Sequence, residues 1–385
     1  MIYIDRKCDI CNNNNLEEVW KYNKIAKTKN SNYNWNINNV ICRNCGFSFV
    51  SPVPTEESLL KYYEDSFYYT ELSTSGIDYS IENRLLILKK YGMCSKTNII
   101  EIGGNFKCQF QKDISSIVNS YVNMEINSSC DSIKSFDTLK KNSFDIITSY
   151  FVLEHIANPA DFLLTCNELL KVDGGILIIE VPNLYNYYIK PEGLHFFEHL
   201  NHFSPRTLSN LAQLNGFKLL EISNKYCSRD FGFVAIFKKE LINKKDDYKD
   251  SIEYTLSKNS IKEGKKLFDD YQIKLNKVRV KIQKKLLNKE NVLIWVANEI
   301  TRDILTDQPV SENIKVVDLN PSKKSFLIDV YASDVLLADN LREYIKKVKL
   351  IIINSPMHAI SIINTLKKDY VLAENVEIIV TLDKY

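Results

Sequence analysis

The stretch Asn98-Ile-Ile-Glu-Ile-Gly-Gly-Asn105 decides the fold of the central part of this chain. Isoleucine-rich residues run into Gly103 and Gly104, which is typical of a buried strand that ends in a tight turn. A dinucleotide-binding fingerprint would place glycines at 103, 105 and 108, but Asn105 and Cys108 occupy the last two positions. The stretch therefore predicts the first strand and turn of an α/β sheet that lacks this fingerprint.

Beyond this strand, short apolar runs alternate with amphipathic segments up to residue 239. This alternation is typical of a mostly parallel sheet covered by helices. Two helices between the strands are expected to begin at Pro159 and at Ser204-Pro205. The further strands are predicted at residues 121–125, 144–149, 176–181, 219–222 and 232–237.

The flanking regions differ from the centre. Residues 1–50 show little helical periodicity and are expected to be rich in loops, whereas residues 56–63 and 79–91 are helix-like. Apolar residues recur at steps of 4, 4, 3, 4 and 4 from Leu267 to Leu286, which predicts a long amphipathic helix. Buried strands and helices then alternate again in a small second α/β unit, with strands at residues 291–296, 314–317 and 349–353. We therefore expect three domains, at residues 1–50, 51–240 and 241–385.

Composition excludes several classes of protein. Of 385 residues, 45% are hydrophobic and 25% charged, as in ordinary globular proteins, and the net charge is +2. This small charge argues against binding driven by a general attraction to nucleic acid or to an anionic membrane. No run approaches about 18 apolar residues, and the first residues lack a signal-peptide core. The sequence predicts a cytoplasmic protein, and it does not indicate an oligomeric state.

Four of the nine cysteines form two close pairs, Cys8-Asp-Ile-Cys11 and Cys42-Arg-Asn-Cys45. Two residues between thiolates let both sulfurs face one tetrahedral ion, and two such pairs complete a four-cysteine zinc site. Gly46 suits the tight turn that follows the second pair. The pattern predicts a structural zinc ion, because four thiolates leave no open coordination position.

The central motifs resemble those of class I S-adenosylmethionine-dependent methyltransferases. Their first motif has the form acid-x-Gly-x-(Gly/Asn), matched here from Glu101 to Asn105, and a second acid, Glu125, ends the next strand. The stretch from Phe144 to His155 is similar to their fourth-strand motif. The resemblance implies a Rossmann-like methyltransferase domain in which the cofactor is bound by Glu101, Gly103, Gly104, Asn105, Glu125, Tyr150 and Phe151.

The whole chain resembles one family in particular, the deoxysugar C-methyltransferases. They combine an N-terminal four-cysteine zinc domain, a methyltransferase domain and a C-terminal Rossmann-like domain. The most specific matches are the Glu-Ile-Gly-x-Asn motif and the stretch Glu198-His-Leu-Asn-His-Phe-Ser-Pro-Arg-Thr-Leu208. The resemblance implies C-methylation of a nucleotide-activated keto sugar through an enolate. His199 would be the base and Glu198 its support, and Tyr68 or Tyr69 would approach the sugar.

Several positions depart from the family pattern. Phe106 and Lys107 replace an expected Asp-Gly, Phe196 replaces a common tyrosine, and only 18 residues separate Glu125 from Phe144. Two alternatives therefore stay open: O-methylation of a sugar or phosphorylated metabolite, and a degenerate methyltransferase that acts as a binding or assembly protein. Without the resemblance, the histidines around Glu198 would suggest a metal cluster, although a polar turn accounts for them more simply.

Overall fold

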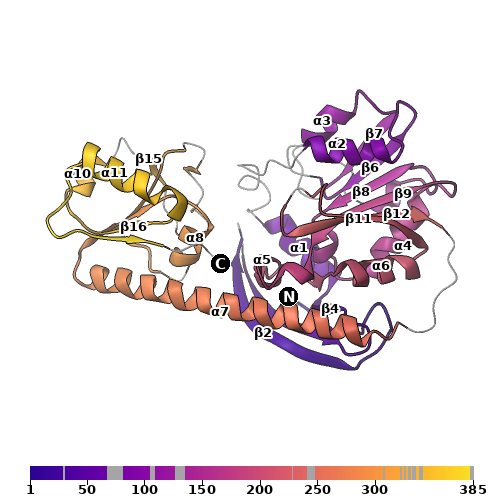
Figure 1. Ribbon diagram of the computed structural model, residues 1–385, viewed down its shortest axis with the longest axis horizontal. Coiled ribbons are helices and arrows are strands. Elements are labelled where there is room, and N and C mark those ends of the chain that lie inside the picture. Colours follow the sequence, from indigo (N-terminus) through magenta and orange to yellow (C-terminus); the bar gives the residue numbers. More distant parts are fainter. Residues whose placement is uncertain are drawn as a thin grey trace. The chain divides into compact units, whose positions relative to one another are not determined.

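The computed structural model describes residues 1–28, 31–66, 81–104, 109–125, 135–227, 229–240, 248–306, 308–320 and 341–381, together with residues 323, 324, 327, 331 and 335–337. The chain divides into two compact units, Met1–Lys266 and Leu267–Tyr385 (Figure 1). Among the described residues, no helix combines the length and the apolar character needed to cross a membrane.

A six-stranded sheet forms the centre of the first unit. Its order is β11-β12-β9-β8-β6-β7, and β7, β6, β8 and β9 are parallel while β12 is antiparallel to both of its neighbours. All six strands predicted for this region are present, with ends shifted by at most two residues. They are β6 (Asn98–Ile102), β7 (Ser120–Met124), β8 (Ile146–Tyr150), β9 (Ile176–Pro182), β11 (Phe217–Ser223) and β12 (Gly232–Lys239).

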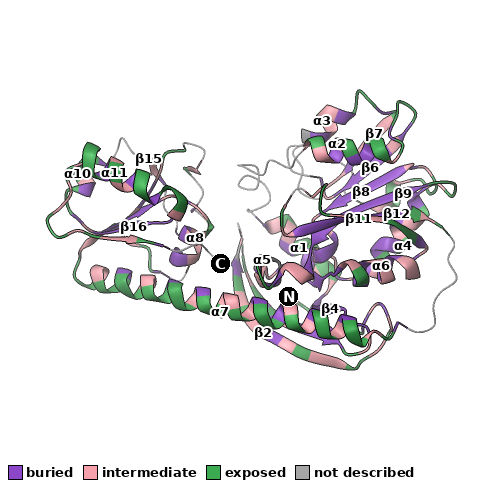
Figure 2. Ribbon diagram, viewed as in Figure 1, coloured by how far each residue is buried: buried purple, intermediate pink, exposed green. Residues whose placement is uncertain are grey.

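Helices cover both faces of this sheet (Figure 1). Apolar residues of α2 (Ile81–Lys90) and α3 (Gln109–Ile114) pack against one face, and those of α4 (Pro159–Leu169) and α6 (Pro205–Leu214) against the other. Figure 2 shows the inner strands β6, β8, β9 and β12 as largely buried. Burial on both faces explains why the strands are continuous apolar runs. The expected α/β fold with a mostly parallel sheet is therefore confirmed for this region.

The first fifty residues form a β-structure, and the expectation of a loop-rich segment is wrong. The strands β2 (Leu16–Lys27) and β3 (Asn32–Cys42) pair along their whole length in a long antiparallel hairpin. This hairpin spans the separation between Cys11 and Cys42. The sequence hides it because asparagines and lysines interrupt the apolar residues along both strands. The short strand β1 (Tyr3–Ile4) precedes the hairpin and pairs with β5 (Val53–Pro54). The strand β4 (Ser48–Val50) follows the hairpin, and α1 (Glu56–Asp65) comes after β5.

The N-terminal sheet is joined to the central region by backbone pairing. The strand β10 (Asn201–His202) is the edge strand of the four-stranded order β10-β4-β3-β2. Val50 also donates a 2.9 Å backbone hydrogen bond to the carbonyl of Leu200. The N-terminal sheet therefore holds the chain immediately after His199.

The predicted long helix is α7 (Ser251–Leu287). Its first turns are anchored by the buried carboxylate of Glu253, which accepts hydrogen bonds from Ser204 at 2.7 Å, from Ser257 at 2.8 Å and from Tyr185. Exposed and buried residues alternate along the helix in Figure 2, as its amphipathic pattern predicts. Tyr271, Leu275 and Ile282 belong to the core of the second unit.

The second unit contains a five-stranded parallel sheet in the order β15-β14-β13-β16-β17. Separate apolar clusters lie on its two faces. The three predicted strands are present. The elements of this unit are β13 (Asn291–Trp295), α8 (Glu299–Leu305), β14 (Ile314–Asp318), β15 (Leu336–Leu337), α10 (Arg342–Ile345), β16 (Val348–Ile353), α11 (Ala359–Asp369) and β17 (Glu377–Val380).

Candidate functional site

The structure brings Cys8, Cys11, Cys42 and Cys45 together, with all four sulfurs within 4.8 Å of one another. The Sγ atoms of Cys8 and Cys45 are 3.4 Å apart, as are those of Cys11 and Cys42. Ligands at 2.3 Å from a tetrahedral zinc ion would be about 3.8 Å apart. The arrangement therefore fits one ion among the four thiolates.

Both cysteine pairs end in the same backbone turn. Asn12 and Gly46, four residues after the first cysteine of each pair, donate their N–H groups to the carbonyls of Cys8 and Cys42 at 2.8 and 2.9 Å. Both residues have positive φ angles, 51° and 75°. A Cβ at position 46 would lie 2.6 Å from the backbone nitrogen of Tyr254 in α7. The knuckle turn expected at Gly46 is confirmed, and close packing on α7 is a second reason for glycine there.

Close packing at the edge of the sheet explains the two glycines of the first motif. Gly103 has φ 77°, and a Cβ there would lie 2.1 Å from the Val152 side chain. A Cβ at Gly104 would lie 1.9 Å from the Asn123 amide oxygen. The loop is thus pressed against β7 and the end of β8, where the carboxyl ends of parallel strands form the usual ligand crevice.

Glu101 is engaged by protein groups. Its carboxylate pairs with the buried Arg84 at 3.1 Å and accepts a hydrogen bond from Tyr121. The Arg84 guanidinium also lies 3.7 Å from the ring centroid of Tyr150. Both candidate cofactor residues, Glu101 and Tyr150, therefore have structural partners that the sequence did not reveal, because Arg84 lies on a separate helix.

Glu125 and Phe151 follow the ends of β7 and β8. The N–H of Gly103 bonds to the Met124 carbonyl at 2.8 Å, which places Glu125 next to the glycine turn along the sheet edge. Phe151 has a positive φ of 56°, a strained conformation for a bulky residue. The Arg229 guanidinium lies 4.8 Å from its ring centroid. Asn105, Tyr68 and Tyr69 lie outside the described residues.

The candidate base His199 is 9% exposed and lies beside His155, with ring centroids 4.8 Å apart. The preceding Glu198 is also buried, and its Oε1 accepts a 2.5 Å hydrogen bond from the Tyr62 hydroxyl of α1. Phe196 lies 5.0 Å from the His199 ring. This part of the site thus combines residues from α1, from the end of β8 and from the chain before β10.

Sequence reasoning missed Glu154 as a member of this site. Its Oε1 lies 3.9 Å from Nε2 of His155 and 4.0 Å from Nε2 of His199. Burial raises the pKa of Glu154 to about 8 and lowers that of His155 to about 4. The Leu-Glu-His motif already placed a carboxylate next to a histidine, but the sequence alone did not show which residues that carboxylate faces.

The other two histidines of the stretch are separate from this cluster. His202 is fully buried, accepts a hydrogen bond from Tyr187 at Nδ1 and bonds Asn39 Oδ1 through Nε2, at 2.9 and 2.8 Å. The ring of His195 packs edge-on against Trp20 at 4.7 Å. A metal cluster of these histidines around Glu198 does not form.

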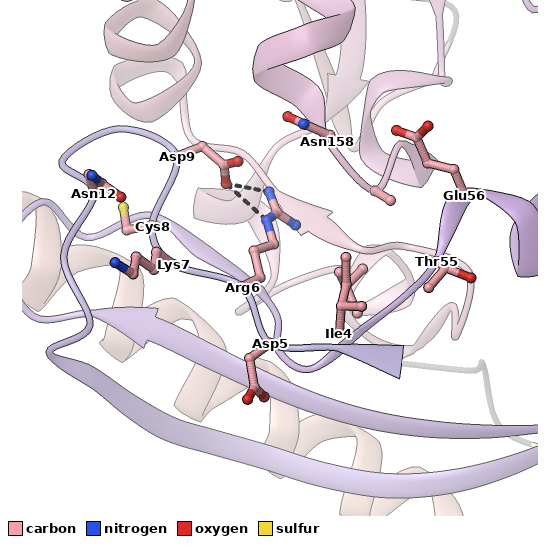
Figure 3. Close-up of a pocket in the computed structure, with 12 residues that line it drawn as sticks. Ile4, Asp5, Arg6, Lys7, Cys8, Asp9, Asn12, Thr55, Glu56 and Asn158 are labelled. Carbon is pink, nitrogen blue, oxygen red and sulfur yellow. Dashed lines mark hydrogen bonds and ion pairs between the residues drawn. The ribbon is translucent and has the colours of Figure 1, made fainter. Parts of the chain in front are cut away.

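A surface hollow of about 520 Å³ lies between the N-terminal segment and the turn after His155 (Figure 3). Arg6 bonds Asp9 within it, and its Nη2 also donates to Oδ1 of Asn201 at 2.7 Å. The remaining charged groups are of both signs and identify no ligand. The hollow is lined by Ile4, Asp5, Arg6, Lys7, Cys8, Asp9, Asn12, Val53, Thr55, Glu56, Ala157 and Asn158.

Comparison with known proteins identifies the central region. Residues 57–222, less than half of the chain, match the family model described as a methyltransferase domain. This region therefore matches the methyltransferase-domain family. The match confirms the enzyme class expected from the sequence, a methyltransferase. The curated proteins give no significant match.

Several solved structures are similar to parts of the chain. One is the 1,6-didemethyltoxoflavin-N1-methyltransferase of Burkholderia thailandensis, with bound 1,6-didemethyltoxoflavin and S-adenosylhomocysteine. It is 10% identical with TM-score 0.40, and the match covers 50% of this chain and 96% of that one. S-adenosylmethionine-dependent methyltransferases of Mesorhizobium loti and Aquifex aeolicus are each 13% identical with TM-score 0.34. Their matches cover 42% and 48% of this chain and 100% of theirs.

Proposed function

We propose that the protein transfers a methyl group from S-adenosylmethionine to a carbon of a nucleotide-activated keto sugar, with His199 as the base. The methyltransferase domain supports the reaction class. The choice of acceptor rests on the resemblance to deoxysugar C-methyltransferases. The base assignment rests on one observation: His199 is buried beside Glu154 and His155, two residues that follow the end of β8.

Methyl transfer to carbon requires a carbanion equivalent. An imidazole can accept a proton near neutral pH. In the proposed step His199 takes the proton beside the sugar carbonyl, and the electron pair of the broken C–H bond forms an enolate. S-adenosylmethionine, when bound, would supply the methyl group to the enolate carbon, and its sulfur would keep the electron pair of the broken sulfur–carbon bond. Glu198, held by Tyr62, stabilises the segment that carries the base.

The residues at the sheet edge fit the cofactor. Gly103 and Gly104 keep the loop after β6 close to the sheet, and Glu125 follows the neighbouring strand end. A carboxylate at this position can accept hydrogen bonds from both ribose hydroxyls. We assign Glu125 to the ribose, and we place Gly103 and Gly104 at the amino-acid end of the cofactor.

We further propose that the four cysteines hold one structural zinc ion. The support is the clustering of their sulfurs and the matching turns at Asn12 and Gly46. The C-terminal sheet supports a second proposal, a Rossmann-like domain, because its order places β14 and β15 on one side of β13, and β16 and β17 on the other.

Calorimetry with S-adenosylmethionine and S-adenosylhomocysteine on the zinc-containing protein tests the cofactor site. We expect both to bind to one site per chain. Absence of binding of either form at millimolar concentration would overturn the proposal and favour a binding protein. Product NMR after incubation with nucleotide-linked keto sugars distinguishes a new carbon–methyl bond from O-methylation.

A further inference from the structure

The cluster formed by Glu154, His155 and His199 contains the ligand types of a metal site. One carboxylate oxygen and two imidazole nitrogens lie within 4.8 Å of one another. All three residues are largely shielded from solvent, and Glu154 is only 1% exposed. Sets of two histidines and one glutamate bind zinc in catalytic sites and leave a coordination position open.

The Glu154 carboxylate is the second observation that points to a ligand. Among the described residues, no other residue donates a hydrogen bond to either of its oxygens. Buried polar groups normally have hydrogen-bond partners or coordinate metals, so the unsatisfied oxygens of the Glu154 carboxyl group are available to a ligand. The nearest candidate partners are the two Nε2 atoms, at 3.9 and 4.0 Å, and these distances are too long for hydrogen bonds.

The orientation of His155 suits a ligand. Its Nδ1 lies 3.0 Å from the backbone carbonyl of Glu198, and a carbonyl can only accept a hydrogen bond. Nδ1 therefore carries the proton, and the lone pair of the neutral ring is on Nε2, the atom nearest Glu154. Metal-binding histidines commonly donate their other ring N–H to a backbone carbonyl in this way.

We infer that Glu154, His155 and His199 form a binding site for a divalent first-row transition-metal ion. Imidazole and carboxylate ligands suit Co²⁺ and Zn²⁺, with bonds of about 2.0–2.2 Å. Ligand atoms of a tetrahedral ion would be about 3.4 Å apart, so small rotations of the three side chains bring them to that spacing. The site is distinct from the four-cysteine cluster in ligand chemistry.

The consequence of this site for activity rests on the proposed function. An ion and a proton compete for the lone pair of His199 Nε2, the atom that faces Glu154. An occupied site therefore lacks the base, and we expect the ion to inhibit methyl transfer that depends on proton abstraction. The ion would act as a regulator of the reaction.

The test is a Co²⁺ titration of the full chain already loaded with one zinc ion, followed by calorimetry and visible absorption. We expect one Co²⁺ site with d–d bands but without a thiolate-to-cobalt charge-transfer band, which would reveal exchange into the cysteines. Loss of a second-shell partner weakens metal binding by about 10–100-fold, so loss of a ligand in Glu154→Gln or His199→Ala should weaken it by at least about 100-fold. The matched control is His358→Ala, because His358 is exposed and lies in the second unit.

Two results would overturn the inference: no binding of Co²⁺ beyond the cysteine site, or equal affinity in wild type and Glu154→Gln. Unchanged zinc content and melting temperature show that each variant is folded. A failure of the metal-site inference can be distinguished from a failure of the proposed function. If the protein binds S-adenosylmethionine but no Co²⁺, only the metal site is wrong, whereas Co²⁺ binding without cofactor binding leaves the site intact and overturns the proposed function.

Discussion

The Tyr62 hydroxyl donates a 2.5 Å hydrogen bond to the Glu198 carboxylate, and both side chains are buried. Tyr62 belongs to α1, whereas Glu198 immediately precedes the candidate base. Burial and the Glu198 carboxylate raise the pKa of Tyr62, so the phenol remains a donor at neutral pH. The contact fixes the segment of His199 to a helix that is distant in sequence.

Replacing Tyr62 with Phe should lower the free energy of unfolding by about 1.5–3 kcal/mol, because a buried carboxylate loses a donor. Urea unfolding with the zinc site loaded measures this loss. Tyr33→Phe is the matched control, since its hydroxyl makes only longer bonds of 3.4 and 3.5 Å and Tyr33 is half-buried. Equal effects of the two substitutions would contradict a special role for the Tyr62–Glu198 contact.

Cys42→Ser should release the proposed zinc ion, because three thiolates bind it less tightly and its binding contributes to folding. Metal analysis of protein purified without chelator should find one zinc ion per wild-type chain and much less in the variant. Hydrogen exchange should increase in β3 and β4, and also in β10, which pairs with β4. Cys94→Ser is a control, because Cys94 is exposed and lies outside the cluster. Wild-type protein without zinc would disprove the metal assignment.

Glu125→Ala should weaken the binding of S-adenosylmethionine by about 1.5–3 kcal/mol, the usual contribution of hydrogen bonds to a charged group. Isothermal calorimetry measures the change directly. Glu168→Ala removes an exposed carboxylate of α4 that pairs with Lys141, and it should leave the affinity unchanged. An unaltered affinity in Glu125→Ala would place the ribose elsewhere.

His199→Ala should reduce turnover by about 10²–10⁴-fold, the range for loss of a general base, while cofactor affinity stays nearly constant. The measurement combines methyl-transfer kinetics with cofactor calorimetry on the same preparation. Both measurements are needed because a collapsed site would lose cofactor affinity as well as turnover. Near-wild-type turnover would rule out His199 as base and direct attention to His195, Tyr68 or Tyr69.

His202 should make stability depend on pH. Burial lowers its pKa to about 3, against 6.5 for an ordinary histidine. The unfolded chain therefore takes up a proton below pH 6.5 while the folded chain does not. The stability contribution present above pH 6.5 is lost as the pH falls toward 3, and about 1.4 kcal/mol is lost by pH 5.5.

His202→Gln lacks this titrating group. It should be less stable than wild type at pH 7.5, since it alters the bonds to Tyr187 and Asn39, but it should lose about 1.4 kcal/mol less between pH 7.5 and 5.5. Urea unfolding at both pH values gives the difference, and the zinc contribution cancels because both proteins contain the site. Parallel pH slopes for the two proteins would show that His202 is not the titrating group.

Local patterns in the sequence were sufficient to predict the strands of the central sheet, the long helix and the α/β class of fold, but not the N-terminal hairpin. The run from Asn98 to Ile102 and its two glycines predicted β6 and its turn, and the apolar steps from Leu267 to Leu286 predicted the long helix. The spacing within each cysteine pair predicted the clustered sulfurs. These features depend on neighbours within a few residues, so periodicity and spacing record them directly.

Only the tertiary structure decided which distant residues meet. It paired β4 with β10, placed Arg84 on Glu101 and brought Glu154 to both His155 and His199. It also showed that a long hairpin joins the two cysteine pairs. Such contacts link segments far apart in the chain, and a single acid or arginine in a local motif carries no signal of the side chain that it will face. The sequence thus determined the strands of the central sheet, the long helix and the spacing of the cysteine pairs, while packing of the strand ends determined the composition of the candidate site.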